Sequence, residues 1–347
     1  LLTSELHGEI AEFATTFPPN TITTNFYGER RQEGAKYRKC ILIPRDHFKT
    51  SLITDSMPIH ILIQPESSNI YFPGQHGADT KIAIIAETQR LASKHLRWIN
   101  THFELNKKLR ALWPELCWEN PSNQSKKWNE KQMIVKRRKD SPDESIQAVG
   151  VGVAITGAHP QVQIKDDMAT LEAANSQTIM EGVKEYHKST RDLFEDQRTN
   201  LEIIVGTPWA LNDIYDDIEK NDDSVQFYKR SVVEDGKIIL PSRFTPELVD
   251  DLRKKRGVMF TLLYMCQPYD PSLVDFNIDD LRYFNMSDGF IAFDEDMRDF
   301  ELSTHRPSKA NEAMPPIALD LRGKPLNAET MRLMKQTGIV LRGVKAS

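Results

Sequence analysis

The chain contains 347 residues, of which 39% are hydrophobic and 27% charged, which is ordinary for a soluble protein with one large or two medium-sized globular domains. The net charge of −5 and the pI near 6.0 exclude a protein that coats nucleic acid permanently, because such a protein needs excess basic residues to neutralise phosphates. No apolar run is long enough for a membrane span, and Cys40, Cys117 and Cys266 are too widely spaced for a disulfide framework or a zinc site, so we expect a reducing cytoplasm.

Short apolar runs alternate with longer amphipathic patterns in the first part of the chain. The runs are bounded by polar or turn residues, as the buried strands of a parallel sheet are. This alternation predicts an α/β fold with a mostly parallel sheet and helices on both faces. The predicted strands are 40–43, 81–86, 162–164 and 201–205, and the predicted helices are 89–112 and 172–194.

Three further segments have patterns that are explained without a binding function. Residues 126–140 (KKWNEKQMIVKRRKD) are basic around a short apolar core, which favours a solvated β-hairpin. Gly150, Gly152 and Gly157 lack the GxGxxG spacing and precede a strand, so they indicate a tight turn. From Asp275 onward the sequence is polar and contains several prolines, which is typical of a linker or a loosely packed tail.

The segment after the first predicted strand has the layout of a phosphate-binding loop. In residues 41–51 (ILIPRDHFKTS) a buried strand runs into a short loop, and Lys49 and Thr50 open a helical pattern. Backbone N–H groups at a helix N-terminus favour phosphate, while the lysine would supply a charge to it and the threonine a hydroxyl ligand for Mg²⁺. The glycines of GxxxxGK[ST] are missing and Phe48 precedes the lysine, so the segment alone also agrees with an ordinary basic helix N-terminus.

An acidic pair, Asp166 and Asp167, follows the strand predicted at 162–164. The carboxyl end of a buried strand is where α/β sheets bind ligands. Asp166 would hold Mg²⁺, directly or through water, and Asp167 would orient and deprotonate an attacking water. The other Asp-Asp pairs, at 216–217, 222–223, 250–251 and 279–280, lie in polar or helical contexts and are most simply solvated turns or helix faces.

Thr207 follows the last predicted strand in the sequence LEIIVGTPW. A hydroxyl at this strand end, near the acidic pair, could sense the terminal phosphate of a nucleotide. The alternative is a turn that leads into a helix beginning near Asn212 or Asp213.

Taken together and in this order, the motifs resemble the ATPase domain of the large terminases of tailed phages. The resemblance rests on PRDHFKTSL, IAETQRLA, the IKDD strand, IIVGTPWALNDI and FTLLYMCQP, and it extends from His7 to Pro268. His7, in LHGEIAEF, resembles an upstream helix often found near the nucleotide site. That family uses a divergent phosphate loop with an arginine after the first strand and no obligatory glycine before the lysine. The implied fold is an additional-strand P-loop NTPase with a parallel-rich central sheet flanked by helices and a small lid subdomain.

The resemblance also implies roles for single residues. Asp166 and Asp167 match the Walker B acidic pair, and Thr207 matches the motif that couples phosphate loss to subdomain movement. Pro208 departs from the arginine common at its position, and residues 156–160 (TGAHP) lack the arginine that often acts on a neighbouring subunit. The implied nucleotide-binding residues are Pro44, Arg45, Asp46, His47, Phe48, Lys49, Thr50 and Ser51, the metal ligands are Thr50 and Asp166, and the catalytic residues are Asp167, Arg45 and Thr207.

Arg45 has a physical role to fill if the loop binds phosphate. Residues other than glycine let fewer backbone N–H groups crowd the phosphates, and a guanidinium would restore charge stabilisation with a planar fork. The alternative is that Arg45 pairs at the surface with Asp46 or Glu87.

The resemblance predicts an ATPase core over residues 1–210, a lid over 211–275, and a linker or tail over 276–347. Large terminases usually carry a C-terminal ribonuclease-H-like nuclease with clustered carboxylates. Few residues follow Pro268, and 317–320 (IALD) is the one strand-plus-aspartate fragment among them. We therefore expect no nuclease activity from this chain.

The implied function is ATP hydrolysis with Mg²⁺, coupled to translocation of duplex DNA into a viral procapsid. The implied partners are transiently bound duplex DNA, the portal protein, the small terminase subunit and further copies of the chain in a ring, at the portal in the host cytoplasm. Two alternatives stay open: a helicase-like P-loop ATPase on the same core, and a non-catalytic assembly protein whose degenerate loop no longer hydrolyses ATP.

Overall fold

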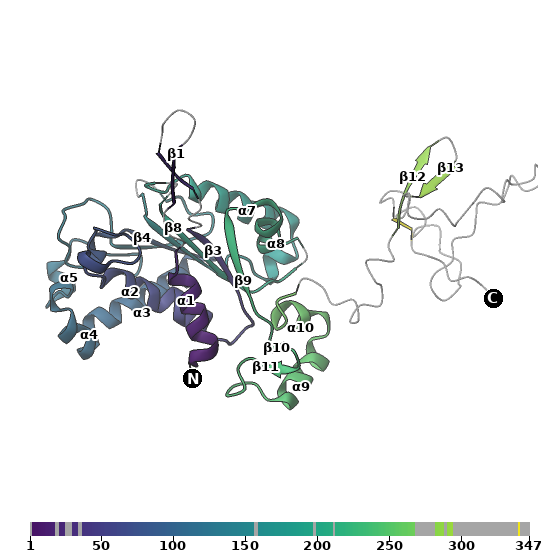
Figure 1. Ribbon diagram of the computed structural model, residues 1–347, viewed down its shortest axis with the longest axis horizontal. Helices are drawn as coiled ribbons and strands as arrows, with labels where there is room; N and C mark the ends of the chain where they lie inside the picture. The colour runs from purple at the N-terminus through teal and green to yellow at the C-terminus, as the bar shows by residue number, and fades with distance from the viewer. Residues whose placement is uncertain are drawn as a thin grey trace, which may run out of the picture. The chain divides into compact units, whose positions relative to one another are not determined.

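The chain divides into two units in the computed structural model, Leu1–Tyr269 and Asp270–Ser347. The structure describes residues 2–17, 21–24, 30–33, 37–155, 159–196, 199–210, 212–267, 282–287, 290–293 and 339–340. The larger unit contains all the residues proposed above for the nucleotide site (Figure 1). Within the described ranges, no helix combines the length and the apolar character needed to cross a membrane.

A seven-stranded sheet forms the centre of the larger unit. Its strands are β3 (Arg38–Leu42), β4 (Ile82–Ala86), β5 (Gln132–Met133), β6 (Ile146–Gly150), β7 (Val162–Asp166), β8 (Leu201–Gly206) and β9 (Val225–Lys229). The order is β5-β6-β4-β7-β8-β3-β9, and all neighbours are parallel except β5 and β6. β8 therefore lies between β3, which leads into the predicted phosphate loop, and β7, which ends at Asp166. The predicted parallel-rich sheet is confirmed.

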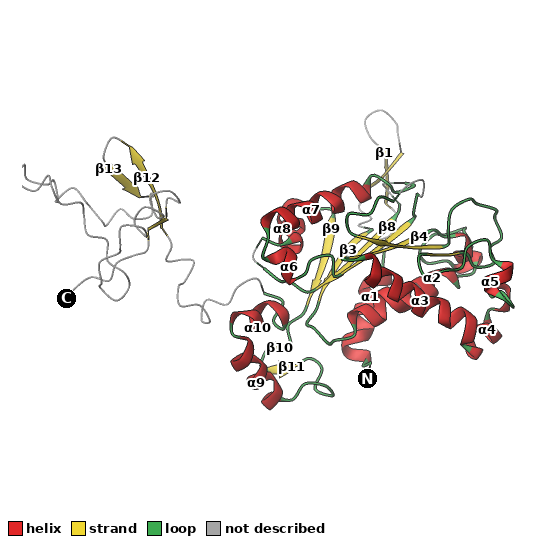
Figure 2. Ribbon diagram, turned by 180° about the vertical axis from the view of Figure 1, so that it is seen from behind, coloured by secondary structure: helices red, strands yellow, loops and turns green. Residues whose placement is uncertain are grey.

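Helices cover both faces of this sheet because its strands are buried on both sides. Ile41 of β3 packs in one hydrophobic core, while its neighbours Cys40 and Leu42 pack in a second core on the opposite face. The first face is covered by η1 (Ser4–Gly8), α1 (Glu9–Thr15), η2 (Ser51–Ser56), α2 (Met57–Leu62) and α3 (Gln89–Leu105), and the second by α7 (Gln177–Arg191) and α8 (Ile214–Asn221) (Figure 2).

Both long helices predicted from the sequence are interrupted by a capping side chain. The segment 89–112 forms α3 and then α4 (Lys107–Leu112), because the Asn106 carboxamide accepts hydrogen bonds from the amides of Lys108 and Leu109. The segment 172–194 forms α6 (Leu171–Ala174) and then α7, whose N-cap is Ser176. Short polar side chains compete for backbone N–H groups and so start new helices. The prediction of one continuous helix in each segment was wrong.

The basic segment 126–140 and the glycines after it form short connections. Trp128 forms an isolated bridge with Met133, and Met133, Ile134 and Val135 are buried, so the predicted hairpin is reduced to a short turn around a buried apolar core. β6 ends at Gly150, and Gly152 has a φ of 81° in the turn that follows, as predicted. Gly157 lies outside the described residues.

A small lobe, residues 231–266, follows the last strand of the sheet. It contains β10 (Val233–Glu234), β11 (Lys237–Ile238), α9 (Pro246–Arg256) and α10 (Val258–Leu263), which lie together in Figure 2. Leu240, Phe244, Phe260 and Leu263 are buried in the same hydrophobic core as the first face of the sheet. The small lobe therefore packs as an extension of the main core.

Two short antiparallel sheets lie outside this arrangement. β1 (Thr21–Thr24) pairs with β2 (Arg30–Glu33) in the larger unit. In the second unit, β12 (Arg282–Ser287) pairs with β13 (Phe290–Phe293) and β14 (Ile339–Val340). These three strands lie in the segment expected to be a linker or tail, and residues 317–320 lie outside the described residues.

Candidate nucleotide-binding site

The loop between β3 and the following helix contains two residues with left-handed backbone, although it has no glycine. Asp46 and Phe48 have φ angles of 64° and 59°, and helical backbone begins at Lys49. A left-handed conformation costs a residue other than glycine about 1–2 kcal/mol. Phe48 occupies the position that glycine holds in GK[ST], so the conformation normally supplied by glycine is kept despite this cost.

Three contacts from other parts of the chain hold the loop in place. The amide of Thr3 donates to Nδ1 of His7 (2.9 Å), so Nε2 of His7 carries the ring proton and donates it to the His47 carbonyl oxygen (3.2 Å). The amide of Arg45 donates to the carbonyl oxygen of Leu263 in the small lobe (3.1 Å). The imidazole of His47 stacks on Phe244, with ring centroids 4.6 Å apart.

His47 is part of the packing of the loop. Its side chain is fully buried, and Nδ1 donates to the Arg45 carbonyl oxygen at 2.8 Å. Burial lowers the pKa of His47 to about 4, so the imidazole is neutral at neutral pH. Any contact of His47 with a phosphate would therefore have to come from its backbone.

Lys49 connects the loop to the ends of β7 and β8. Its ammonium group donates to the hydroxyl of Thr207 at 2.7 Å and lies 3.8 Å from a carboxylate oxygen of Asp167. The lysine is 7% exposed. Asp167 has a left-handed backbone (φ 43°) and donates its amide to the Val205 carbonyl oxygen at 2.9 Å, which fixes it against β8.

Thr50 and Asp166 form the second half of the cluster. The hydroxyl of Thr50 donates to Oδ1 of Asp166 at 3.2 Å. His95 of α3 lies 3.6 Å from Oδ2 of the same carboxylate, and its other ring nitrogen is 2.8 Å from Asp55. Burial and the charge of Asp167 raise the pKa of Asp166 to about 7. Burial lowers the pKa of His95, but the hydrogen bond to Asp55 and the charges of Asp166 and Asp55 outweigh this effect and raise it.

The oxygen atoms of Thr50 and Asp166 suit Mg²⁺. This hard cation prefers oxygen ligands and usually takes one or two from protein in addition to phosphate oxygens and water. In the part of the chain that the structure describes, no group of three or more His, Cys, Asp or Glu residues could hold a metal ion by itself. A hollow of about 490 Å³ is lined by Thr50, Asp55 and His95 among others, but not by Lys49, Asp166 or Thr207, so it borders the cluster only on its α3 side.

Arg45 is exposed, and its guanidinium carbon lies 4.9 Å from the ring centroid of Trp209. Trp209 is held in turn, because its amide donates to Asp213 at 3.0 Å. Asp46 pairs with Arg243 of the small lobe at 3.7 Å. The stacked position of Arg45 thus differs from the surface ion pair with Asp46 or Glu87 that was the alternative prediction.

The structure brings five of the predicted residues into direct contact: Lys49, Thr50, Asp166, Asp167 and Thr207. Arg45, Asp46 and Phe48 surround this cluster as parts of the loop, whereas Pro44 is buried and Ser51 is exposed at the helix start. The turn that was the alternative for Thr207 is made by Asp213, which caps α8 through the amides of Tyr215 and Asp216.

Three residues near the site were not predicted: His95, Arg243 and Phe244. His95 did have a signal, because it lies three residues after Ala92 and four before Ile99, on the buried face of α3. A polar side chain on a buried helix face needs a hydrogen-bond partner. Arg243 and Phe244 have no such signal, because nothing local in their sequence indicates contact with a loop about two hundred residues earlier.

Comparison with known proteins finds similarity at the level of structure. No protein-family model and no curated protein matches the chain. The chain is similar to the large terminase of bacteriophage HK97, with a TM-score of 0.41 and 18% identity over 66% of this chain and 46% of that one. It is also similar to the ATPase domain of the large terminase of Thermus phage P74-26, with a TM-score of 0.41 and 14% identity over 67% of this chain and 89% of that one. The chain therefore spans less than half of the length of the HK97 protein.

Proposed function

We propose that the larger unit binds ATP with Mg²⁺ at the carboxyl edge of its sheet and hydrolyses the bond between the β- and γ-phosphates. The observation that carries this proposal is the convergence of one ammonium group, two hydroxyls and two carboxylates from the ends of β3, β7 and β8. These groups meet at a helix N-terminus, which favours anions. Phosphoryl transfer depends mainly on positioning and charge stabilisation, and this set of groups supplies both.

Each residue has a distinct role in the proposed reaction. Lys49 leaves Thr207 for the phosphate oxygens, because a phosphate carries more charge than a hydroxyl, and this frees the Thr207 hydroxyl for the γ-phosphate. Thr50 and Asp166 hold Mg²⁺, which would neutralise charge on the phosphates. Asp167, whose buried Oδ1 has no hydrogen-bond partner among the described residues, orients a water molecule and accepts its proton. The water oxygen attacks the γ-phosphorus as the bond to the ADP oxygen breaks.

The wider proposal is a motor that drives duplex DNA into a procapsid. It is supported by the motif resemblance to large terminases and by β8 lying between β3 and β7, which is the additional-strand order. In this proposal residues 1–210 are the ATPase core, which α8 and β9 complete because they belong to the sheet and its second face, and the lid expected over 211–275 is confined to the small lobe. The portal protein, a small terminase subunit and neighbouring copies in a ring are the proposed partners, and the host cytoplasm is the proposed location.

The direct test is nucleotide binding and ATP turnover by purified protein. Lys49→Ala should weaken nucleotide binding because it removes the buried cation, and Asp167→Asn should bind normally but turn over about a hundredfold more slowly. Lys81→Ala and Asp143→Asn are the matched controls, since they remove an ion pair of 3.4 Å at the opposite end of β4. Wild-type turnover by Asp167→Asn would remove Asp167 from the mechanism.

The finer functions are separated by adding DNA. A packaging motor should show ATP turnover stimulated by duplex DNA and movement along the duplex without strand separation. Unwinding of a labelled duplex would identify the helicase-like alternative. Nucleotide binding without any turnover, with or without DNA and portal, would identify the non-catalytic assembly protein.

A further inference from the structure

Arg243 of the small lobe contacts two residues of the proposed phosphate loop. Its guanidinium nitrogen is 3.7 Å from Oδ1 of Asp46, and its guanidinium carbon is 4.9 Å from the ring centroid of Phe48. Both partners belong to the loop that ends in Lys49. Among the described residues, Arg243 is therefore the one cationic side chain of the small lobe that contacts this loop.

Backbone hydrogen bonds and the neighbouring Phe244 hold Arg243 beside the loop. The amides of Arg243 and Phe244 both donate to the Leu240 carbonyl oxygen, at 3.1 and 3.0 Å. Phe244 is buried and stacks on His47 of the loop. The residue next to Arg243 is thus fixed against the loop, which keeps the guanidinium within reach of whatever occupies the loop.

The present partner of Arg243 is a carboxylate at a loop built to receive phosphate. Asp46 has a left-handed backbone, and its side chain is 60% exposed, while that of Arg243 is 41% exposed. An ion pair this exposed is weak. A nucleotide phosphate carries more charge and can be bound by two guanidinium N–H groups at once, so it competes well for the same arginine.

We propose that Arg243 is a phosphate-binding residue of the small lobe and that Asp46 holds it as a stand-in for phosphate when no nucleotide is present. The proposal rests on the proposed nucleotide-binding function and adds a second cation to the site, from the lobe rather than from the loop. When a nucleotide binds, Arg243 would release Asp46 and bind a phosphate instead, so the contacts of the small lobe would depend on whether a nucleotide is bound. It also follows that Asp46 lowers nucleotide affinity by competing for Arg243.

Two substitutions should change nucleotide affinity in opposite directions. Arg243→Ala should weaken the binding of a fluorescent ATP analogue about tenfold, the usual effect of losing one charged hydrogen-bonding group. Asp46→Asn should tighten it several-fold, because the carboxamide no longer competes by charge, and asparagine tolerates the left-handed backbone as well as aspartate does. Binding is measured by fluorescence anisotropy, with thermal denaturation of the nucleotide-free variants as the check on folding.

Arg253 provides a closely matched control. It lies in the same lobe, 3.8 Å from Asp250 and with its guanidinium carbon 5.2 Å from the Phe260 ring centroid, so it has the same two kinds of contact away from the loop. Arg253→Ala and Asp250→Asn should leave analogue affinity unchanged. Equal weakening by Arg243→Ala and Arg253→Ala would show a general effect of lobe charge and overturn the proposal.

The double variant decides whether Asp46 acts through Arg243. If it does, Asp46→Asn should tighten binding in the wild-type background but not in Arg243→Ala. The same tightening in both backgrounds would mean that Asp46 repels phosphate directly, and unchanged affinity in Arg243→Ala would remove the arginine from the site. Either result overturns this proposal while wild-type binding still supports the nucleotide site, whereas no binding by the wild type refutes the proposed function itself.

Discussion

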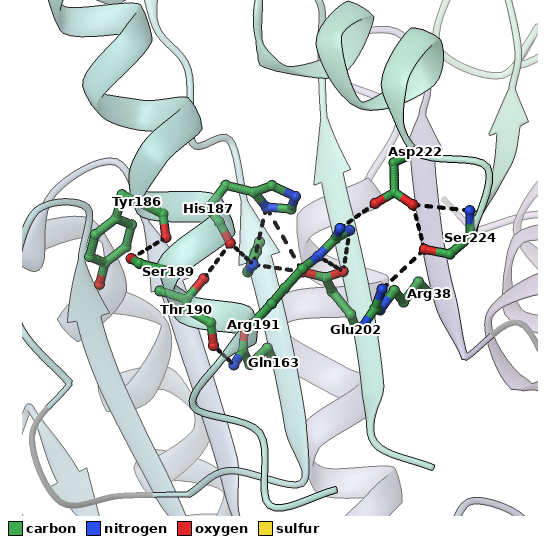
Figure 3. Close-up of polar contacts among 11 residues, drawn as sticks. Arg38, Gln163, Tyr186, His187, Ser189, Thr190, Arg191, Glu202, Asp222 and Ser224 are labelled. Carbon is green, nitrogen blue, oxygen red and sulfur yellow. Dashed lines mark hydrogen bonds and ion pairs between the residues drawn. The ribbon is translucent and has the colours of Figure 1, made fainter. Parts of the chain in front are cut away.

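His187 of α7 is held neutral inside a buried ionic network, and the stability of the fold should depend on pH because of it. Its Nδ1 lies 3.1 Å from the ammonium group of Lys165, which also donates to Glu202 at 2.6 Å. Figure 3 shows His187 and Arg191 of α7 beside Glu202 of β8. Arg191 donates to the other carboxylate oxygen of Glu202 at 2.8 Å. Burial, followed by the charge of Lys165, lowers the pKa of His187 to about 3. The network joins α7 to β7 and β8, whose ends hold Asp166 and Thr207.

The size of the effect follows from the two protonation states. In the unfolded chain His187 takes up a proton near the ordinary pKa of 6.5, whereas in the folded chain it does so near 3. The stabilisation that depends on neutral His187 is therefore fully present above pH 6.5 and is lost as the pH falls. On acidification from pH 8 to pH 5, His187 should lower the free energy of unfolding by about 2 kcal/mol. Asp166 acts in the opposite sense: its pKa is raised from 3.8 to about 7, so its contribution is present at low pH and lost as the pH rises through 7. Asp166 therefore offsets His187 on acidification, while His47, whose pKa is also lowered to about 4, acts in the same sense as His187, so the wild-type curve alone does not isolate His187.

Comparison with His187→Asn isolates the histidine, because Asn can keep an acceptor oxygen near the position of Nδ1 for Lys165. Urea denaturation of both proteins at pH 8 and pH 5, with EDTA and without nucleotide, gives the free energies of unfolding. The advantage of the wild type over the variant should shrink by about 2 kcal/mol on acidification, equivalent to roughly 4–8 °C in Tm. His159→Asn, at an exposed histidine, should follow the wild-type curve. An advantage that stays constant from pH 8 to pH 5 would refute the neutral, buried state of His187.

Substitutions at three further positions test the surroundings of the site. Arg45→Ala should lower ATP turnover about a thousandfold. Arg45→Lys should restore little of this turnover, because lysine lacks the planar guanidinium that can both stack on Trp209 and bind phosphate. Near-normal turnover by both variants would make Arg45 a surface residue without a role in the reaction. Gly206→Ala should lower the free energy of unfolding by about 1–3 kcal/mol in urea titrations, because the added Cβ would lie 2.2 Å from the buried ring of Tyr215. An unchanged urea midpoint would contradict this packing. Asp213→Ala should cost about 1–2 kcal/mol, since it caps α8, while Asp213→Asn should cost less; equal losses would show that the carboxamide cannot replace the cap.

The strands and their order along the chain could be predicted because their signals are local. Four apolar runs bounded by polar residues became β3, β4, β7 and β8 with small shifts at the ends. The carboxyl ends of parallel strands meet at one edge, so the polar residues after these strands could be expected to converge. The register confirms this for the neighbouring strands, since Leu42 pairs with Gly206 and Asp166 pairs with Val205.

The features that could not be predicted depend on contacts between distant segments. β6 and β9 have only one or two strong strand formers on each face, and they were not expected before the sheet showed them pairing with β4 and β3. The breaks at Asn106 and Ser176 depend on a side chain winning a backbone N–H group against the helix, which periodicity does not detect. Arg243, which pairs with Asp46, and Phe244, which stacks on His47, come from the small lobe, and no local pattern links those segments.

The loop between β3 and Lys49 has no glycine, and this accounts for its contacts with distant residues. A glycine-rich loop adopts left-handed backbone at little cost, so its own sequence suffices to specify its shape. Asp46 and Phe48 adopt such backbone at a cost, and conformations of this kind persist only where the surroundings over-determine them. Here the surroundings are His7 on one side and the small lobe on the other, through Phe244 and the Leu263 carbonyl oxygen.

This dependence has a mechanical consequence for the small lobe. Because Arg45 donates its amide to Leu263, and His47 packs on Phe244, a displacement of the lobe would act on the loop at two positions two residues apart. Loss of either contact would release part of the strain held at Asp46 and Phe48 and would let the loop leave its left-handed conformation. A loop shaped by its own glycines would not respond in this way. The substitution of bulky residues for glycine therefore makes the geometry at Lys49 depend on the position of the small lobe, even before any nucleotide is bound.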